Sequence, residues 1–491
     1  MTATASTASA EAVGTRAGER SAAWASWEVA ALAAVLAVAL GLRLHGLTQA
    51  PLLTDNADEL YFAWYGLNLI LHGDAYTWSY LPGYPSTTVL HAYGTTFPLV
   101  HHSMDHPPLF GLIIGGWCWL TGARDMLQVT AAQVRALPVA FGTLSVLLAH
   151  LLGRRLMGPG PALLGAALLA TAPGAVLVGR QAEPESLQAL LLLAALLLTM
   201  RILDGSAGPW SLAGLLACCL AAPLLKVPGI AVAGICAPIL AAGRRWWPAA
   251  ATLAAAAAGL LLFALYGWLV DWSLFVRIWG DQAATRSGML SGFDFIAAAA
   301  GINRSLHDGW WLLGWIGLGV LAARGEPRRE LFLVWPPVAY AAVMLVLAAE
   351  ARVENYAWYR LIVYPGVELG AGWLAWEAVR RRSLPLLTLL LVLGGAASTN
   401  WWLGGMGRSW VPNPFLLTLL MAVVLVPSVL VARPAGPGRG SRPVGRRMAG
   451  LDSGGAGLRR WALGAGVAAV GFMLIGNVVE SLWLPAIFTH M

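Results

Sequence analysis

The chain of 491 residues is 58% hydrophobic and only 11% charged, and its mean hydropathy is +0.68. Ordinary soluble domains have about 25% charged residues, so the composition excludes that class and indicates a polytopic membrane protein. The net charge of +7 does not predict nucleic-acid binding, because the arginines form short clusters between apolar segments, where they set membrane orientation. The four cysteines lie in apolar stretches without ligand spacing, which argues against a disulfide framework or a zinc motif.

The N-terminal region predicts a polar tail followed by a long outer loop. Residues 1–25 are rich in Ala, Thr, Ser and Gly, and we expect a disordered inner tail. The remaining residues, 26–491, are expected to form a single transmembrane domain. Its first span, residues 27–47, has the roughly 20 apolar residues that a bilayer core requires. Residues 48–130 then form the first outer loop.

This loop carries an unusual cluster of acids for so apolar a chain: Asp55, Asp58 and Glu59. Asn56 followed three residues later by Glu59 resembles a capping box, and Gly73 is a natural helix terminator, so a helix is predicted from about residue 57 to 72. Carboxylates in its first turn are stabilised by free N–H groups and the helix dipole. For Glu59, helix capping and a functional role are equally good interpretations. One capping acid suffices, however, so Asp58 is a candidate base.

The segment Pro107–Gly122 is apolar, but its 16 or so residues make a short crossing. If it stays on the outer surface as a juxtamembrane or re-entrant helix, the later arginine clusters all lie inside. This choice predicts an all-α protein with about 13 spans, a second outer loop at 271–308 and a basic inner loop at 433–460. The spans after the first are expected at about 131–152, 159–179, 185–202, 209–225, 228–243, 247–270, 309–323, 331–349, 359–379, 384–400, 414–432 and 461–481.

Four sequence features occur in an order that matches a known group of enzymes. They are ADELYFAWYGLNLILHGD from Ala57, DHPPL from Asp105, Arg135 in VRALPVAFGTLSVLL, and TAPGAVLVGRQAEPE from Thr171. This set resembles the protein O-mannosyltransferases and the bacterial lipid A aminoarabinose transferases. Both belong to the C-type (GT-C) superfamily of polytopic membrane glycosyltransferases. The resemblance covers about the first 200 residues.

The resemblance implies that a sugar, hexose or pentose, moves with inversion from a polyprenyl-phosphate sugar to an acceptor hydroxyl. The acceptor would be a protein, a lipid or a cell-wall glycan at the outer face of the cell membrane, among membrane lipids. Asp58 matches the catalytic Asp that takes the acceptor proton. A glycosyl transition state is oxocarbenium-like and favours a nearby carboxylate, whereas the departing phosphate needs cations and N–H donors. No cofactor is required for this chemistry.

Five residues are expected to bind substrate: Glu59, His106, Arg135, Lys226 and Arg360. The cations among them lie at outer span ends, where snorkelling to headgroups is the competing explanation. That explanation is weakest for Lys226, the only lysine of the chain, because the positive-inside rule does not account for it. For Arg360, a surface ion-pair set with Glu350, Arg352 and Glu354 is the alternative.

By the same resemblance, a divalent metal ion would be held by Asp105 and His307, which form an incomplete ligand set. His101, His102 and Asp308 are further ligand candidates, and ordinary polar loop side chains are the alternative. Two other functions compete with sugar transfer. A lipid or solute transporter or flippase would bury ionisable residues mid-membrane or show related halves with broken helices. A ligase of lipid-linked glycans would be expected to carry a larger loop near the chain end.

Overall fold

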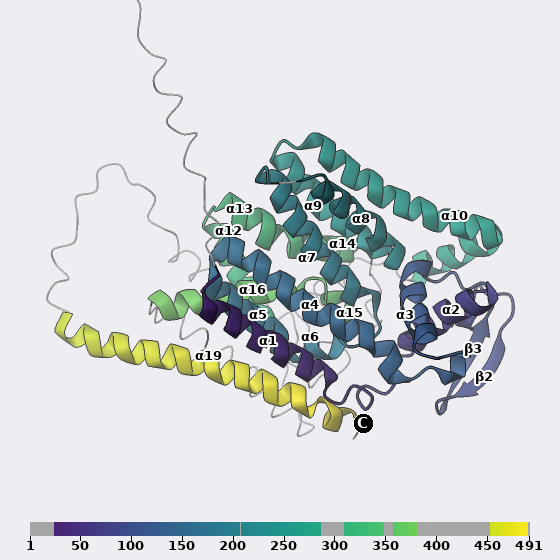
Figure 1. Ribbon diagram of the computed structural model, residues 1–491, viewed down its shortest axis with the longest axis horizontal. Helices are drawn as coiled ribbons and strands as arrows, with labels where there is room; N and C mark the ends of the chain where they lie inside the picture. The colour runs from purple at the N-terminus through teal and green to yellow at the C-terminus, as the bar shows by residue number, and fades with distance from the viewer. Residues whose placement is uncertain are drawn as a thin grey trace, which may run out of the picture.

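The computed structural model describes residues 24–206, 208–285, 309–347, 357–381, 390 and 452–489, and these are mostly helical (Figure 1). Five of the described helices are long and apolar enough to cross a membrane: α1 (Ser26–Leu44), α4 (Ala131–Met157), α7 (Pro184–Leu203), α10 (Trp246–Thr285) and α19 (Asp452–Thr489). Shorter helices complete the bundle: α5 (Pro159–Thr171), α6 (Pro173–Val178), α8 (Pro209–Leu225), η2 (Val227–Ile230), α9 (Ala231–Ala242), α12 (Gly309–Ala323), α13 (Pro327–Arg329), η3 (Glu330–Val334), α14 (Trp335–Leu347), α15 (Ala357–Arg360) and α16 (Tyr364–Arg381). The chain is therefore a multi-pass membrane protein.

Each predicted span in the described part coincides with a helix or a broken pair of helices. The span expected at 159–179 is divided before Pro173, since proline lacks the N–H that an uninterrupted helix would use. Helix α10 continues past its expected end, with non-helical backbone at Asp271. The spans expected at 384–400 and 414–432 lie outside the described residues apart from 390, as do most of the tail and the basic inner loop. The count of about 13 spans stays a prediction.

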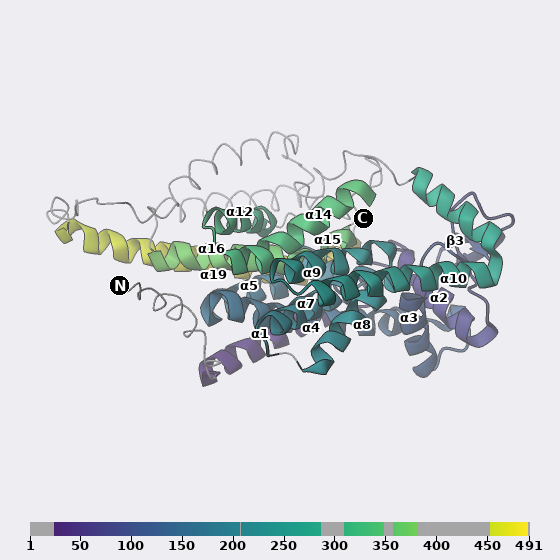
Figure 2. The same cartoon turned by 90° about the horizontal axis from the view of Figure 1, so that it is seen from above.

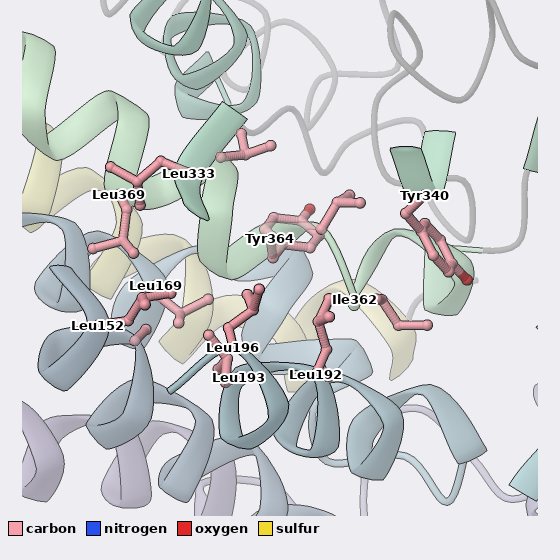
Figure 3. Close-up of a cluster of buried hydrophobic side chains, with 14 of the residues drawn as sticks. Leu152, Leu169, Leu192, Leu193, Leu196, Leu333, Tyr340, Ile362, Tyr364 and Leu369 are labelled. Atoms are coloured by element: carbon pink, nitrogen blue, oxygen red, sulfur yellow. The ribbon is translucent and has the colours of Figure 1, made fainter. Parts of the chain in front are cut away.

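The apolar core lies between two groups of helices (Figure 3). Leucines of α4, α5 and α7 face side chains from η3, α14 and α16, and the labelled residues are at most 4% exposed. Such sequences are apolar on nearly every side because both their protein-facing and lipid-facing positions avoid water.

Glycines bring the central helices unusually close. A Cβ on Gly165 of α5 would meet the backbone of Glu368 and Leu369 in α16, and one on Gly372 of α16 would strike Gly165 itself. Gly314 and Gly317 of α12 contact α16 in the same manner. Helices in membranes associate largely through such small-residue contacts, because lipid tails are as apolar as leucine.

One end of the bundle carries a separate cap (Figure 1). It contains α2 (Asp58–His72), α3 (Pro108–Leu120), the short η1 (Met126–Gln128) and a small antiparallel sheet. The sheet has the order β1 (Thr77–Trp78), β3 (Thr95–Val100), β2 (Thr88–Ala92), and Ala92 lies opposite Thr95. Tyr93 and Gly94 both have positive φ, which is the type I′ pattern of two-residue hairpins. The all-α prediction is wrong in this respect.

Helix α3 packs on α2 through three glycines, and it also contacts α4 and α8. A Cβ on Gly66 would overlap the backbone of Gly111, and one on Gly115 would overlap Gly66 and Leu67. Helix α3 has only 13 residues, so it is short for a crossing. Its predicted position at the membrane surface stays a prediction.

The opposite end of the bundle is rich in arginine. Arg154 pairs there with Glu28 at 2.6 Å, and the buried His150 ring lies 3.2 Å from the same carboxylate oxygen. Glu377 of α16 pairs with three arginines: Arg324, Arg380 and Arg381. The arginine clusters therefore gather at the end remote from α2, as positive-inside sorting expects when the cap faces outward.

Candidate active site

The polar residues near the start of α2 meet at the end of the bundle that carries the cap. They come from the loop before α2, from the N-terminal parts of α2, α4 and α7, from the α6–α7 connection and from the end of α8. The connection, residues 179–183, lies at the centre, because it contacts groups from α1, α2 and the preceding loop. Segments separated by more than 100 residues thus form one polar cluster inside an apolar protein.

Glu59 and Arg135 form a fully buried ion pair, with both side chains 0% exposed. The Arg135 guanidinium donates to the two carboxylate oxygens at 2.8 and 2.5 Å and to the Leu47 carbonyl at 2.6 Å. The N–H of Ala182 donates to Glu59 at 3.0 Å. The capping-box prediction is wrong, because α2 begins at Asp58 without a side-chain cap and Glu59 is engaged with Arg135. The predicted terminator Gly73 is confirmed by its left-handed φ of 70°.

Asn56 binds a second buried acid instead of capping α2. Its side-chain amide donates to Glu183 Oε1 at 2.8 Å, while Glu183 Oε2 has no hydrogen-bond partner among the described residues. Burial raises the pKa of Glu183 well above its usual value, and the nearby Asp58 carboxylate raises it further. Asp58 and Glu183 therefore lie within electrostatic reach of each other, with Asp58 partly exposed at the start of α2.

Lys226 pairs with the second acid of the α7 start. Its Nζ lies 2.7 Å from Glu185 Oε1, and the two side chains are 5% and 1% exposed. The same ammonium stands 4.4 Å from the ring centre of Tyr359, which is a cation–π contact. Arg360, also in α15, is 2% exposed and lies 6.0 Å from the ring centre of Trp311.

The connection also buries polar atoms that the fold does not satisfy. Arg180 is 0% exposed and donates one N–H to the His45 carbonyl at 2.6 Å, but its Nε and Nη2 have no partner among the described residues. The Nε2 and Oε1 atoms of Gln181 are also buried without a hydrogen-bond partner among the described residues. An unmade buried hydrogen bond costs about 1–3 kcal/mol, so this stretch is poorly explained by stability alone.

Asp105 and His106 belong to the segment of the cap that packs on the first turns of α2. The Asp105 carboxylate accepts hydrogen bonds from the Tyr84 hydroxyl and from Ser79 Oγ, the latter at 2.7 Å. The His106 ring lies 5.3 Å from the Tyr61 ring and 5.2 Å from the Phe62 ring, centre to centre. Phe62 stands one helical turn after Asp58, so His106 packs on the side of α2 that also carries Asp58.

Comparisons with known proteins bear on the fold that carries this cluster. A family model described as dolichyl-phosphate-mannose-protein mannosyltransferase matches residues 105–268. The structure of ArnT from Cupriavidus metallidurans bound to undecaprenyl phosphate superposes with a TM-score of 0.55 at 14% identity, covering 94% of this chain and 78% of that one. The apo ArnT structure gives 0.52 at 16% identity, with 94% and 77% coverage. The chain has the fold of the GT-C membrane glycosyltransferases.

A third structure agrees with this fold. Arabinosyltransferase EmbB from Mycobacterium smegmatis superposes with a TM-score of 0.54 at 15% identity, covering 96% of this chain and 42% of that one. No curated protein matches the sequence.

Most of the predicted site residues that the structure describes lie around the start of α2 and the α6–α7 connection. Glu59, Arg135 and Asp58 adjoin the α6–α7 connection, and Lys226 joins them through Glu185. His106 reaches α2 from the cap, and Arg360 follows Tyr359, on which Lys226 rests. Sequence reasoning did not select Arg180, Gln181 or Asn56. A signal for Arg180 was present, since a cation between two apolar segments at this end is unexplained by positive-inside sorting.

The described residues do not by themselves form the expected metal site. Both Asp105 oxygens accept hydrogen bonds from hydroxyl groups, and His307 and Asp308 lie outside the described residues. His101 and His102 instead bind the carboxylate of Asp74, at 2.6 and 2.9 Å. Within the described ranges, no group of three or more His, Cys, Asp or Glu side chains has a metal-binding arrangement. We therefore assign no catalytic step to a metal.

Proposed function

We propose that this protein transfers a sugar from a polyprenyl-phosphate sugar to an acceptor hydroxyl at the outer membrane face, with inversion at the anomeric carbon. The proposal rests on one observation above the others: Asp58 opens α2 within electrostatic reach of Glu183, inside a cluster of buried cations drawn from several helices. The bound undecaprenyl phosphate of the ArnT structure, which shares this fold, supports a polyprenyl-phosphate donor.

Asp58 is the proposed base. Its carboxylate lies in the first turn of α2, where the helix dipole favours the ionised form, and its side chain is partly exposed. It accepts the proton of the acceptor hydroxyl while the hydroxyl oxygen bonds to the anomeric carbon. The bond from that carbon to the phosphate oxygen breaks on the opposite side, and the polyprenyl phosphate leaves. Glu183 keeps a second carboxyl beside this centre, and Asn56 fixes its orientation.

The leaving phosphate needs cations. The buried cations of the cluster differ in how fully their N–H groups are already hydrogen-bonded within the protein. Arg135 is occupied by Glu59, so we assign it to holding α4 against α2. Arg180 Nε and Nη2 have no hydrogen-bond partner among the described residues, and we propose Arg180 as a phosphate ligand together with Lys226, Arg360 and His106. Lys226 would exchange or share its Glu185 contact when the donor binds.

The decisive test uses two neighbouring acids of the same loop. Asp58→Asn should abolish transfer from candidate polyprenyl-phosphate sugars, detected by mass analysis of glycosylated products, in protein that remains folded. Asp55→Asn is the matched control, because Asp55 is exposed and accepts the Leu52 N–H within its own turn at 2.7 Å. It should transfer sugar at close to the wild-type rate. Full activity in Asp58→Asn would remove the proposed base.

The orientation needs its own measurement. Single cysteines introduced at exposed Tyr80 of the cap and at exposed Trp246 should react differently with a membrane-impermeant thiol reagent in intact cells. Labelling at position 80 and protection at position 246 are expected if the cap faces outward. The reverse pattern would place the proposed chemistry on the inner face.

A further inference from the structure

The last part of α10 is a separate helix that folds back onto the cap. At Asp271 the backbone leaves the helical region, with φ −163° and ψ 101°, and the helix axis turns (Figure 2). The Asp271 carboxylate accepts from the Leu274 N–H at 3.0 Å and from Ser273 Oγ at 2.8 Å. This side chain therefore caps a new helical segment, residues 272–285, and allows it to take a direction different from that of the membrane-length part.

One stripe of this segment is buried against the cap. Leu274 and Ile278, four residues apart, are 4% and 0% exposed and pack in a small core with Tyr84, Val100 and Met104. Gln282, a further four residues along, is 5% exposed. The spacing puts all three side chains on one helical face, and that face is directed at the strand end and loop before Asp105.

Two polar side chains on this segment bind the loop backbone directly. Trp279 Nε1 donates to the Met104 carbonyl at 3.0 Å, and Gln282 Nε2 donates to the Asp105 carbonyl at 2.6 Å. Pro107 and Pro108 follow, and they have no N–H with which to anchor the chain. The main chain just before His106 is thus fixed by α10, while the Asp105 carboxylate is fixed by Tyr84 and Ser79.

We infer that Trp279 and Gln282 are positioning residues for sugar transfer, acting by holding His106 over α2 where it meets the donor phosphate. The inference rests on the proposed function, in which His106 binds substrate. In this role the two side chains act on the main chain before His106 rather than on the substrate. They fix the carbonyls of the two residues before His106, so that the ring stays between Tyr61 and Phe62. Loss of these two hydrogen bonds would loosen the main chain before His106, although Tyr84 and Ser79 would still hold the Asp105 side chain.

The test measures the donor KM of Gln282→Met and Trp279→Phe, which remove a donor while keeping an apolar side chain in place. A positioning role raises the donor KM about two- to tenfold for each hydrogen bond lost, with kcat nearly unchanged. A purely structural role lowers the amount of active enzyme and leaves KM unchanged. Trp272→Phe is the matched control, since its half-exposed ring lies on the same segment and stacks on Phe275.

Two further measurements make the outcome decisive. In a His106→Ala background, Gln282→Met should raise KM no further, because it acts through His106; an equal rise in both backgrounds would overturn the inference. Hydrogen exchange of peptides covering residues 103–106 should speed up in Gln282→Met, and this readout needs no activity. Unchanged exchange and unchanged KM would also overturn it. If the wild-type protein transfers no lipid-linked sugar, that result counts against the proposed function. Hydrogen exchange would still test whether Gln282 holds the segment before His106.

Discussion

The buried pair of Glu59 and Arg135 gives the sharpest prediction on stability. Arg135→Met removes the guanidinium that donates to Glu59, and the carboxylate then keeps the hydrogen bond from the Ala182 N–H. Glu59→Gln leaves the Arg135 guanidinium beside a neutral amide. Both side chains are 0% exposed, so water does not replace the lost partner. Each single change should therefore lower the free energy of unfolding by about 3–5 kcal/mol.

The double variant separates a specific pair from two independent sites. Because the second substitution removes the charge that the first left unpaired, the two losses should not add, and the coupling energy should reach about 2 kcal/mol or more. The assay is equilibrium unfolding of the purified protein in mixed detergent micelles, followed by circular dichroism. Arg328→Met is the control, because the Arg328–Asp204 pair is largely exposed and is worth about 0–1 kcal/mol. Strict additivity of the two buried substitutions would refute the reasoning.

Two other predictions concern the cap. Gly115→Ala should separate α2 from α3 and destabilise the protein by about 1–3 kcal/mol. The neighbouring change Gly116→Ala should be neutral or stabilising, because the described atom nearest to its Cβ is in Ile70, 3.6 Å away. Equal thermal midpoints of the two variants in detergent would contradict the close packing of α2 and α3. Burial raises the pKa of Asp74, but hydrogen bonds from the His101 ring and the His102 N–H outweigh it and hold the pKa below the usual value. Its contribution to stability is thus fully present above about pH 4 and is lost progressively as the pH falls toward the lowered pKa, so Asp74→Asn should lower the thermal midpoint more at pH 7 than at pH 3.

The correction at Glu59 shows where sequence reasoning reaches its limit. A capping box is a local pattern, and Asn56 and Glu59 have the correct spacing for it. In the fold, neither side chain caps the helix. Asn56 binds Glu183, 127 residues away, and Glu59 binds Arg135, 76 residues away. Packing buries Glu59 completely, and a buried carboxylate without a partner would be very costly, so its pairing with Arg135 prevails over a local cap.

The sequence alone determined the membrane class, the acidic loop and the helix positions of the described part, because each depends on hydropathy over about 20 residues or on local turn chemistry. It also brought Asp58, Lys226 and His106 to attention as charges or imidazoles without a sorting role. Only the tertiary structure decided which charges form ion pairs, such as Lys226 with Glu185. It alone also showed that the last part of α10 binds the segment before His106. Those pairings depend on how helices far apart in the chain pack together, and short-range sequence patterns contain no record of that packing.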